Sequence, residues 1–251
     1  MANTISYNEY IDYSPDDNIW KPIENEEIPF YRTLIENVYH TFENGTKKEK
    51  GDSMEKLMTF IYQRFKAIKV CHNVRSNDNQ IDHIVEFIDG MTPAFIQHYI
   101  GLRLIGESKN HKKTIGSREV SNLDELLRDK DSKLGVFSSF YSFSKGQSMW
   151  VNAEGKRRKL ALKYGRKIIG FTIKELESLV EKNFYTLLKQ KFNNLVDEIE
   201  DDFSDHDCKS PYNVSLLNNL IQLNNLGIID QEAFINGKRL IEERYGNTDI
   251  E

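Results

Sequence analysis

The chain has 251 residues, of which 39% are hydrophobic and 29% are charged, and its formal net charge is −5. This length suits one sizeable core with appendages, or two small domains. No segment approaches the roughly 20 apolar residues of a transmembrane helix, and the first residues lack the pattern of a secretory signal, so we expect no membrane partner. Cys71 and Cys208 lie far apart, which excludes a disulfide framework or zinc ribbon and suits a reducing compartment. We therefore expect a cytoplasmic protein.

Charge is unevenly distributed along the chain. Residues 1–50 carry a net charge of −5, residues 51–174 carry +9 and residues 175–251 carry −9. A binding partner responds to the local field rather than to the total charge, so the basic centre could attract a polyanion. The alternative is that the acidic flanks fold back and neutralise this centre.

Hydrophobic periodicity and turn residues predict two helices, then three strands, then helices and strands in alternation. Ser53 and Thr172 are expected to be helix N-caps. The order predicts an α/β fold with a mixed β-sheet flanked by helices. The expected helices are 30–43, 54–66, 118–128, 147–164 and 173–191, and the expected strands are 67–74, 80–88, 102–109, 134–140 and 167–171.

Composition divides the chain into four expected segments. Residues 1–50 form an acidic arm with a helix, and residues 51–190 form the α/β domain. Residues 191–211 are an acidic linker, and residues 212–251 are a helical C-terminal segment. The α/β domain thus coincides with most of the basic centre.

Three charged residues stand at the ends of two apolar strands. Asp82 opens the strand 80–88, while Glu107 and Lys109 end the next strand. Residues two apart in a strand share a face, so Glu107 and Lys109 project together. If the two strands pair as a hairpin, Asp82 lies beside Glu107, and two carboxylates with a strand carbonyl form an oxygen site for Mg²⁺. The alternative is a non-catalytic ion pair between Asp82 and Lys109.

These residue types suit hydrolysis of a phosphodiester. Mg²⁺ polarises a phosphoryl oxygen and lowers the pKa of a bound water. Lys109 could orient or deprotonate that water, or stabilise the developing negative charge. Glu55, on the helix 54–66, could complete the metal shell or hold a ligand water; the alternative is a solvent-facing helix residue.

The segments "QIDHIVEF", "LIGESKNHKK", "EVSNLDELL" and "LGVFSSF" resemble the PD-(D/E)xK nuclease superfamily, and most of all its Mrr-like restriction endonuclease branch. The resemblance covers residues 51–180. It implies a restriction-endonuclease-like fold and Mg²⁺-dependent DNA cleavage, with Mn²⁺ as a substitute, in restriction or defence against foreign DNA. It also implies that Asp82 and Glu107 bind the metal, that Lys109 is the catalytic lysine and that Glu55 is the family's first-helix glutamate.

The sequence departs from that family's pattern at three places. Gln80 matches a polar residue often seen two before the aspartate, but the proline of the "PD" half-motif is absent. Ser108 stands where the family usually has cysteine, and residues 89–98 form an insertion-like stretch between the second and third strands. These departures leave a non-catalytic nucleic-acid-binding or assembly subunit, and an RNA nuclease, as alternatives.

Basic side chains form two clusters that each follow a predicted core strand, so they could flank the carboxylate site. Contacts of this kind give salt-sensitive affinity for phosphates without base specificity. The alternative is a solvated basic helix. The expected contacts to the DNA backbone are Lys112, Lys113, Arg118, Lys156, Arg157, Arg158 and Lys159.

The C-terminal segment has leucines at helical spacing on either side of Gly227. It resembles the short SHOCT motif, which implies homo-oligomerisation or docking of a protein partner through residues 212–245. The alternative is that two short helices pack against the nuclease-like domain.

Overall fold

The computed structural model describes residues 16–75, 80–145, 152–197 and 229–245, together with positions 217, 220, 221 and 224. The chain divides into two compact units, Met1–Asp202 and Phe203–Glu251, which are described separately below. None of the helices in the described ranges is both long and apolar enough to cross a membrane.

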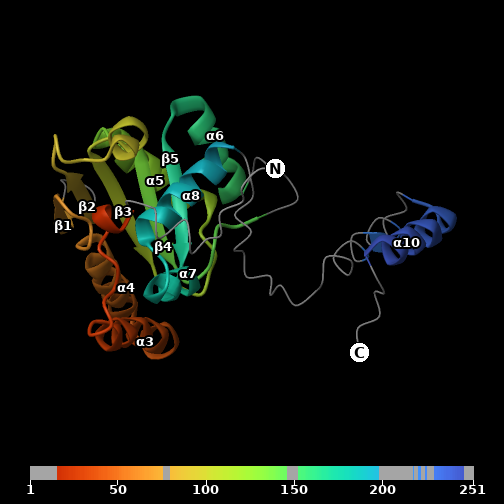
Figure 1. The fold of residues 1–251 in the computed structure, drawn as a ribbon, viewed down its shortest axis with the longest axis horizontal. Helices are drawn as coiled ribbons and strands as arrows, with labels where there is room; N and C mark the ends of the chain where they lie inside the picture. Colours follow the sequence, from red (N-terminus) through yellow and green to blue (C-terminus); the bar gives the residue numbers. More distant parts are fainter. Residues whose placement is uncertain are drawn as a thin grey trace. The chain divides into compact units, whose positions relative to one another are not determined.

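The first unit is built on a five-stranded sheet (Figure 1). Its strands lie side by side in chain order, the first three antiparallel and the last three parallel. The mixed sheet with flanking helices that the sequence predicted is therefore confirmed. The strands are β1 (Ile68–Arg75), β2 (Gln80–Phe87), β3 (Arg103–Lys109), β4 (Leu134–Ser139) and β5 (Lys167–Thr172).

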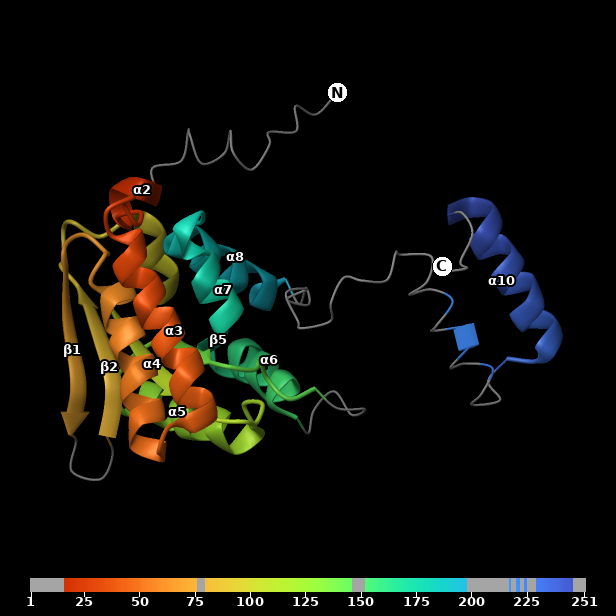
Figure 2. The same ribbon diagram turned by 90° about the horizontal axis from the view of Figure 1, so that it is seen from below.

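Helices cover both faces of the sheet and bury two apolar clusters. One cluster packs the sheet against the N-terminal helices and against the last helices of this unit (Figure 2). These helices are α2 (Asp16–Ile19), α3 (Ile28–Asn44), α4 (Lys47–Tyr62), α7 (Ile173–Glu177) and α8 (Phe184–Val196). The other cluster packs the opposite face against α5 (Ser117–Asp129) and α6 (Ala153–Tyr164).

Helix α4 begins earlier than the sequence predicted. Its N-cap is Thr46, whose side chain accepts a hydrogen bond from the Glu49 amide while the Glu49 carboxylate accepts one from the Thr46 amide. Ser53 is therefore not the cap; it is buried inside the helix, 2.7 Å from the Thr41 hydroxyl. The reciprocal cap satisfies two amides at the helix start, which a single serine cannot do.

The helix expected over 173–191 is interrupted. Thr172 caps α7 as predicted, but the chain then passes through the 3₁₀ turn η2 (Ser178–Val180) before α8 begins. Asn183 starts the new helix, because its side-chain oxygen accepts from two backbone amides and its side-chain amide donates to the Trp20 carbonyl. A π-helix, η1 (Ile96–Ile100), likewise precedes β3 in the stretch that separates the second and third strands.

The N-terminal segment from residue 16 onward is part of this first unit. Trp20 is fully buried and its indole donates a 2.8 Å hydrogen bond to the Ile61 carbonyl. Asp16 is also buried, and it accepts from the Thr186 hydroxyl and pairs with Lys189. Residues 1–15 of the expected acidic arm lie outside the described residues.

The pair formed by Glu27 and Arg64 fastens this segment to the end of α4. The Arg64 guanidinium is nearly buried, contacts both Glu27 oxygens and also donates to the Lys21 carbonyl. This hydrogen bonding lowers the pKa of Glu27 from 4.5 to about 2. The contact therefore adds stability above about pH 4.5, and that stability is lost as the pH falls toward 2.

We expect Glu27→Gln to lower the free energy of unfolding at pH 7 by about 1–3 kcal/mol, because it leaves a nearly buried cation without its counter-ion. Denaturant titration at pH 7 and pH 3 checks this, and the difference from the wild type should shrink at the lower pH. Glu24→Gln is the control, since Glu24 pairs with the exposed Lys21. Equal effects of the two variants at pH 7 would contradict this role of Arg64.

The second unit contains helix α10 (Gln231–Tyr245). Gly237 packs against Leu220, while Ile235 and Leu240 are more than half exposed. A helix within the C-terminal segment is thus present as predicted. Of the expected linker 191–211, residues 191–196 belong to α8 and residues 198–211 lie outside the described residues.

Candidate active site

Asp82 lies near the start of β2 and is almost buried. Its carboxylate accepts a 2.8 Å hydrogen bond from the backbone N–H of Ser108 on β3. In the pairing of β2 with β3, His83 lies opposite Gly106. Continuing that antiparallel register by one residue sets Asp82 opposite Glu107, so the hairpin expected from the sequence is present.

Glu107 and Lys109 project together from the end of β3. The Lys109 ammonium lies 2.5 Å from Oε1 of Glu107. The other carboxylate oxygen, Oε2, is buried and has no hydrogen-bond partner among the described residues. A buried carboxylate oxygen without a donor is costly, which marks it as a position where a cation could bind.

Burial and mutual repulsion perturb the two carboxyl groups. The pKa of Glu107 is raised from 4.5 to about 7: burial raises it most, the neighbouring Asp82 carboxylate also raises it, and Lys109 opposes both. Burial also raises the pKa of Asp82, whereas the hydrogen bond from the Ser108 amide and the charge of Lys109 act to lower it. A cation between the two carboxylates would remove this repulsion.

Lys109 stays protonated in this environment. Burial acts to lower its pKa, but the hydrogen-bonded Glu107 and the nearby Asp82 outweigh burial, so the pKa lies above its ordinary value. An ammonium group can orient a water and stabilise negative charge, but it cannot accept a proton. Of the roles considered from the sequence, the structure thus favours orientation and charge stabilisation over proton removal.

Glu55 joins the cluster from α4. Burial and then the Asp82 carboxylate raise its pKa, while a hydrogen bond from the Asn73 side chain lowers it. Glu55 also raises the pKa of Glu107, so the three carboxylates share one electrostatic environment. Glu55 is half-buried beside the other two carboxylates, so it is not the solvent-facing helix residue that the sequence left as the alternative.

The donor set fits Mg²⁺ with waters as additional ligands. No group of three His, Cys, Asp or Glu side chains in the described part of the chain is arranged to hold a metal directly. Mg²⁺ commonly binds one or two carboxylates and keeps several waters. Asp82 and Glu107 would hold the ion, and Glu55 would reach one of its waters.

A layer of side chains behind the carboxylates was not predicted from the sequence. His83 is fully buried, its Nε2 lies 2.9 Å from the Thr59 hydroxyl, and burial lowers its pKa to about 4, which keeps it neutral. Tyr62 packs edge-on against His83, and its hydroxyl lies 2.7 Å from where a β-carbon on Gly106 would be. The absence of a side chain at Gly106 lets Tyr62 approach the strand and support the site. The sequence signal was only a histidine beside Asp82.

The basic residues fall into an exposed group and a structural group. Lys113, Arg118 and Lys159 are exposed, and so is Lys112, although it pairs with Glu43 at 2.6 Å. His111 and Lys109 both interact with Glu119 of α5, so the loop after β3 adjoins the site. The exposed members remain candidates for backbone contacts.

Arg157 does not belong to the exposed group. Only 2% of it is exposed; its guanidinium binds Glu154 at 2.7 Å and covers the Phe143 ring. Arg158 binds the same carboxylate, and Lys156 donates to the Ser121 hydroxyl. The expectation that Arg157 contacts DNA is therefore not supported, because its charge is used inside the fold to anchor α6.

No family model matches the chain, and searches of curated proteins and of solved structures likewise find no match.

Proposed function

We propose that this protein is a Mg²⁺-dependent endonuclease that hydrolyses DNA phosphodiester bonds. The observation that supports this most strongly is the buried Glu107 carboxylate, which has Lys109 on one oxygen, no partner on the other and Asp82 beside it. A structural ion pair would not need a second buried acid next to it. An oxygen-ligand metal site does.

The residues of the chain have separate tasks in this reaction. Asp82 and Glu107 would hold the ion, which when bound would polarise the phosphoryl group and lower the pKa of a water. Lys109 orients the attacking water and stabilises the charge that develops on the phosphate oxygens. Water adds to phosphorus as one phosphorus–oxygen ester bond breaks, which leaves one phosphate end and one hydroxyl end.

The charge distribution supports a polyanionic substrate. The segment 51–174 carries a net charge of +9, and Lys112, Lys113 and Arg118 lie in or just after the loop that follows β3. Such contacts favour any nucleic acid backbone. We propose DNA as the substrate and restriction or defence as the role because of the family resemblance, and an RNA arm in the assay tests the alternative.

The test is cleavage of plasmid DNA and of a matched RNA with Mg²⁺, Mn²⁺ or EDTA. We expect metal-dependent cleavage of DNA and a loss of about 100-fold or more in Asp82→Asn, because that variant loses a carboxylate ligand. The control is Asp89→Asn, which makes the same chemical change at an exposed turn. Full activity of Asp82→Asn, or binding without cleavage under every metal condition, would overturn the proposal.

A further inference from the structure

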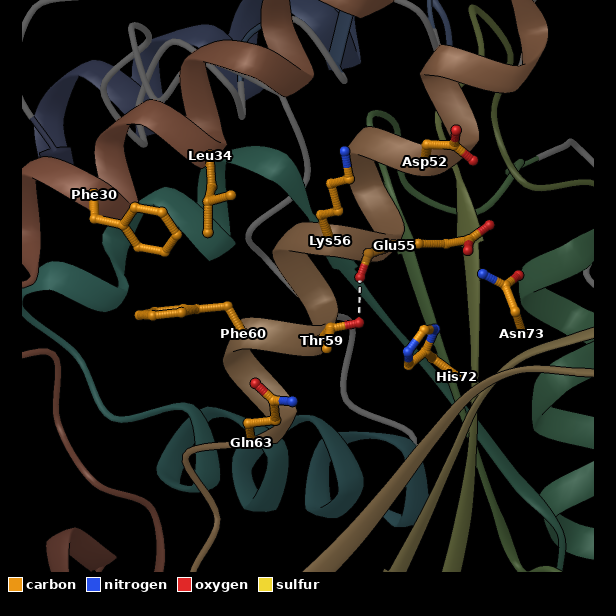
Figure 3. A pocket seen from close by; sticks show the side chains of 10 residues that line it. All are labelled: Phe30, Leu34, Asp52, Glu55, Lys56, Thr59, Phe60, Gln63, His72 and Asn73. Atoms are coloured by element: carbon orange, nitrogen blue, oxygen red, sulfur yellow. Dashed lines mark hydrogen bonds between the residues drawn. The ribbon is translucent and has the colours of Figure 1, made fainter.

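A cavity of about 600 Å³ opens between α3, α4 and β1 (Figure 3). Its volume lies within the range of about 300–1,000 Å³ that is typical of small-ligand sites. One of its lining residues is Glu55, which also belongs to the candidate metal cluster. A molecule in the cavity would therefore lie next to the proposed site of cleavage.

One wall of the cavity is aromatic. Phe60 is held in place, with the Arg64 guanidinium 5.1 Å and the Tyr31 ring 5.6 Å from its centroid. Phe30 contacts Phe60 edge-on at 5.7 Å, yet 57% of Phe30 remains exposed. A fixed ring beside an exposed ring offers a stacking surface to a flat ligand.

The opposite wall is polar, and one of its residues has a left-handed backbone conformation. Asn73 of β1 has a φ of 51°, a left-handed conformation that is uncommon for a residue other than glycine. Gln80 donates a 2.9 Å hydrogen bond to the Asn73 side-chain oxygen, and the Asn73 side chain acts to lower the pKa of Glu55. Figure 3 shows Glu55, His72 and Asn73 on the side of the cavity away from the two phenylalanines.

The charges of this wall select against phosphate. Asp52 and Glu55 line the cavity against a single cation, Lys56. Carboxylate and amide oxygens accept hydrogen bonds from the exocyclic amino groups of bases. The cavity thus combines an aromatic surface with acceptors, and it repels the backbone that the exposed lysines attract.

We propose that this cavity binds one unstacked nucleobase, carrying an exocyclic amine, from the nucleic acid strand held at Asp82 and Glu107. The inference rests on the proposed nuclease function. The base would stack on the exposed ring of Phe30, beside Phe60, and donate from its amine toward Glu55 or Asp52. The protein would thereby require local unpairing of its substrate next to the cleaved bond.

The test measures binding of single-stranded oligonucleotides by the full chain in EDTA, with one series containing an abasic site at each position in turn. We expect Phe30→Ala to weaken binding of the intact oligonucleotide about 5- to 100-fold, the range that stacking of a base on an aromatic ring covers. At one position, removal of the base should weaken binding by the wild type to the level that Phe30→Ala shows with the intact oligonucleotide. Removal of the same base should not weaken binding by Phe30→Ala any further.

Two further variants separate stacking from general damage. Phe30→Trp should retain binding, because it keeps an aromatic face. Leu162→Ala removes a side chain on α6 that is 64% exposed and should bind like the wild type. Thermal unfolding of each variant checks that the fold is retained.

The outcomes distinguish this inference from the proposed function. If Phe30→Ala binds every oligonucleotide as the wild type does while the protein cleaves DNA, the base site is wrong and the nuclease stands. The base site is also wrong if Phe30→Ala weakens binding of the intact oligonucleotide and of every abasic oligonucleotide by the same factor. If neither the wild type nor any variant binds an oligonucleotide in EDTA, the base site is wrong, and the nuclease proposal is decided separately by cleavage with Mg²⁺.

Discussion

Glu107→Gln should make the metal-free protein more stable at pH 8 and should abolish its stabilisation by Mg²⁺. The pKa of Glu107 is raised from 4.5 to about 7 by burial and by Asp82, so the native state loses stability as the pH rises from about 4.5 through 7. Glutamine resembles the protonated acid and removes that cost. The gain at pH 8 is about 2–3 kcal/mol, or a midpoint on the order of 5 °C higher, and it should vanish below about pH 4.5.

Thermal unfolding across pH 4–8, with and without Mg²⁺, measures both effects. The wild type should gain stability as Mg²⁺ is added, because the ion binds only the native carboxylates, and Glu107→Gln should gain far less. Glu125→Gln is the matched control, since Glu125 is exposed and pairs with Arg128 on the surface. A Glu107→Gln variant that is less stable than the wild type at pH 8, or that keeps the full Mg²⁺ effect, would contradict the assigned role of Glu107.

Lys109→Ala should reduce the rate of DNA cleavage by roughly 10²–10³-fold, the usual effect of removing one group that stabilises transition-state charge. The lysine is not expected to bind the metal, so the Mg²⁺-dependent rise in thermal stability should persist in this variant. That combination separates a loss of chemistry from a loss of the metal site. Single-turnover cleavage rates and Mg²⁺ titrations by thermal unfolding give the two readouts.

The control for this variant is Lys113→Ala, which removes an exposed lysine from the same loop. We expect it to weaken DNA binding modestly and to leave the single-turnover rate at saturating protein unchanged. If Lys109→Ala cleaves as fast as the wild type, the lysine is only a structural partner of Glu107. If it also loses its response to Mg²⁺, its contribution is to the metal site rather than to the reacting phosphate.

The sequence predicted the core of the site because its geometry is local. Glu107 and Lys109 are two residues apart in a strand, and Asp82 lies on the adjoining strand of a hairpin. Period-two alternation and one antiparallel pairing are sufficient to bring these three side chains together. The sheet was predictable for the same reason, since each strand is a short apolar run bounded by turn residues.

Two features were not predicted. Ser53 resembles an N-cap, but the local capping box of Thr46 and Glu49 starts the helix about two turns earlier. Arg157 resembles its basic neighbours in the sequence, yet only the packing of Phe143 and the position of Glu154 make it a buried anchor.

The cavity beside Glu55 also depends on contacts between distant segments. The cavity forms where α3, α4 and β1 meet, and residue spacing along the chain does not predict that these elements come together. Phe30 and Asn73 could not be identified as functional candidates from residue type alone. Phe30 lies in an ordinary amphipathic helix, and Asn73 lies near the end of a predicted strand.

The central claim is that Asp82 and Glu107 share a divalent cation. Crystals grown with Mn²⁺ and measured at its absorption edge test this most directly, because the anomalous signal locates the ion independently of the protein density. We expect a single strong peak about 2.1 Å from an oxygen of each carboxylate, with the ion on Glu107 Oε2 and Lys109 remaining close to Oε1. An anomalous map without a peak at these carboxylates, from crystals in which both side chains are ordered at saturating Mn²⁺, would contradict the claim.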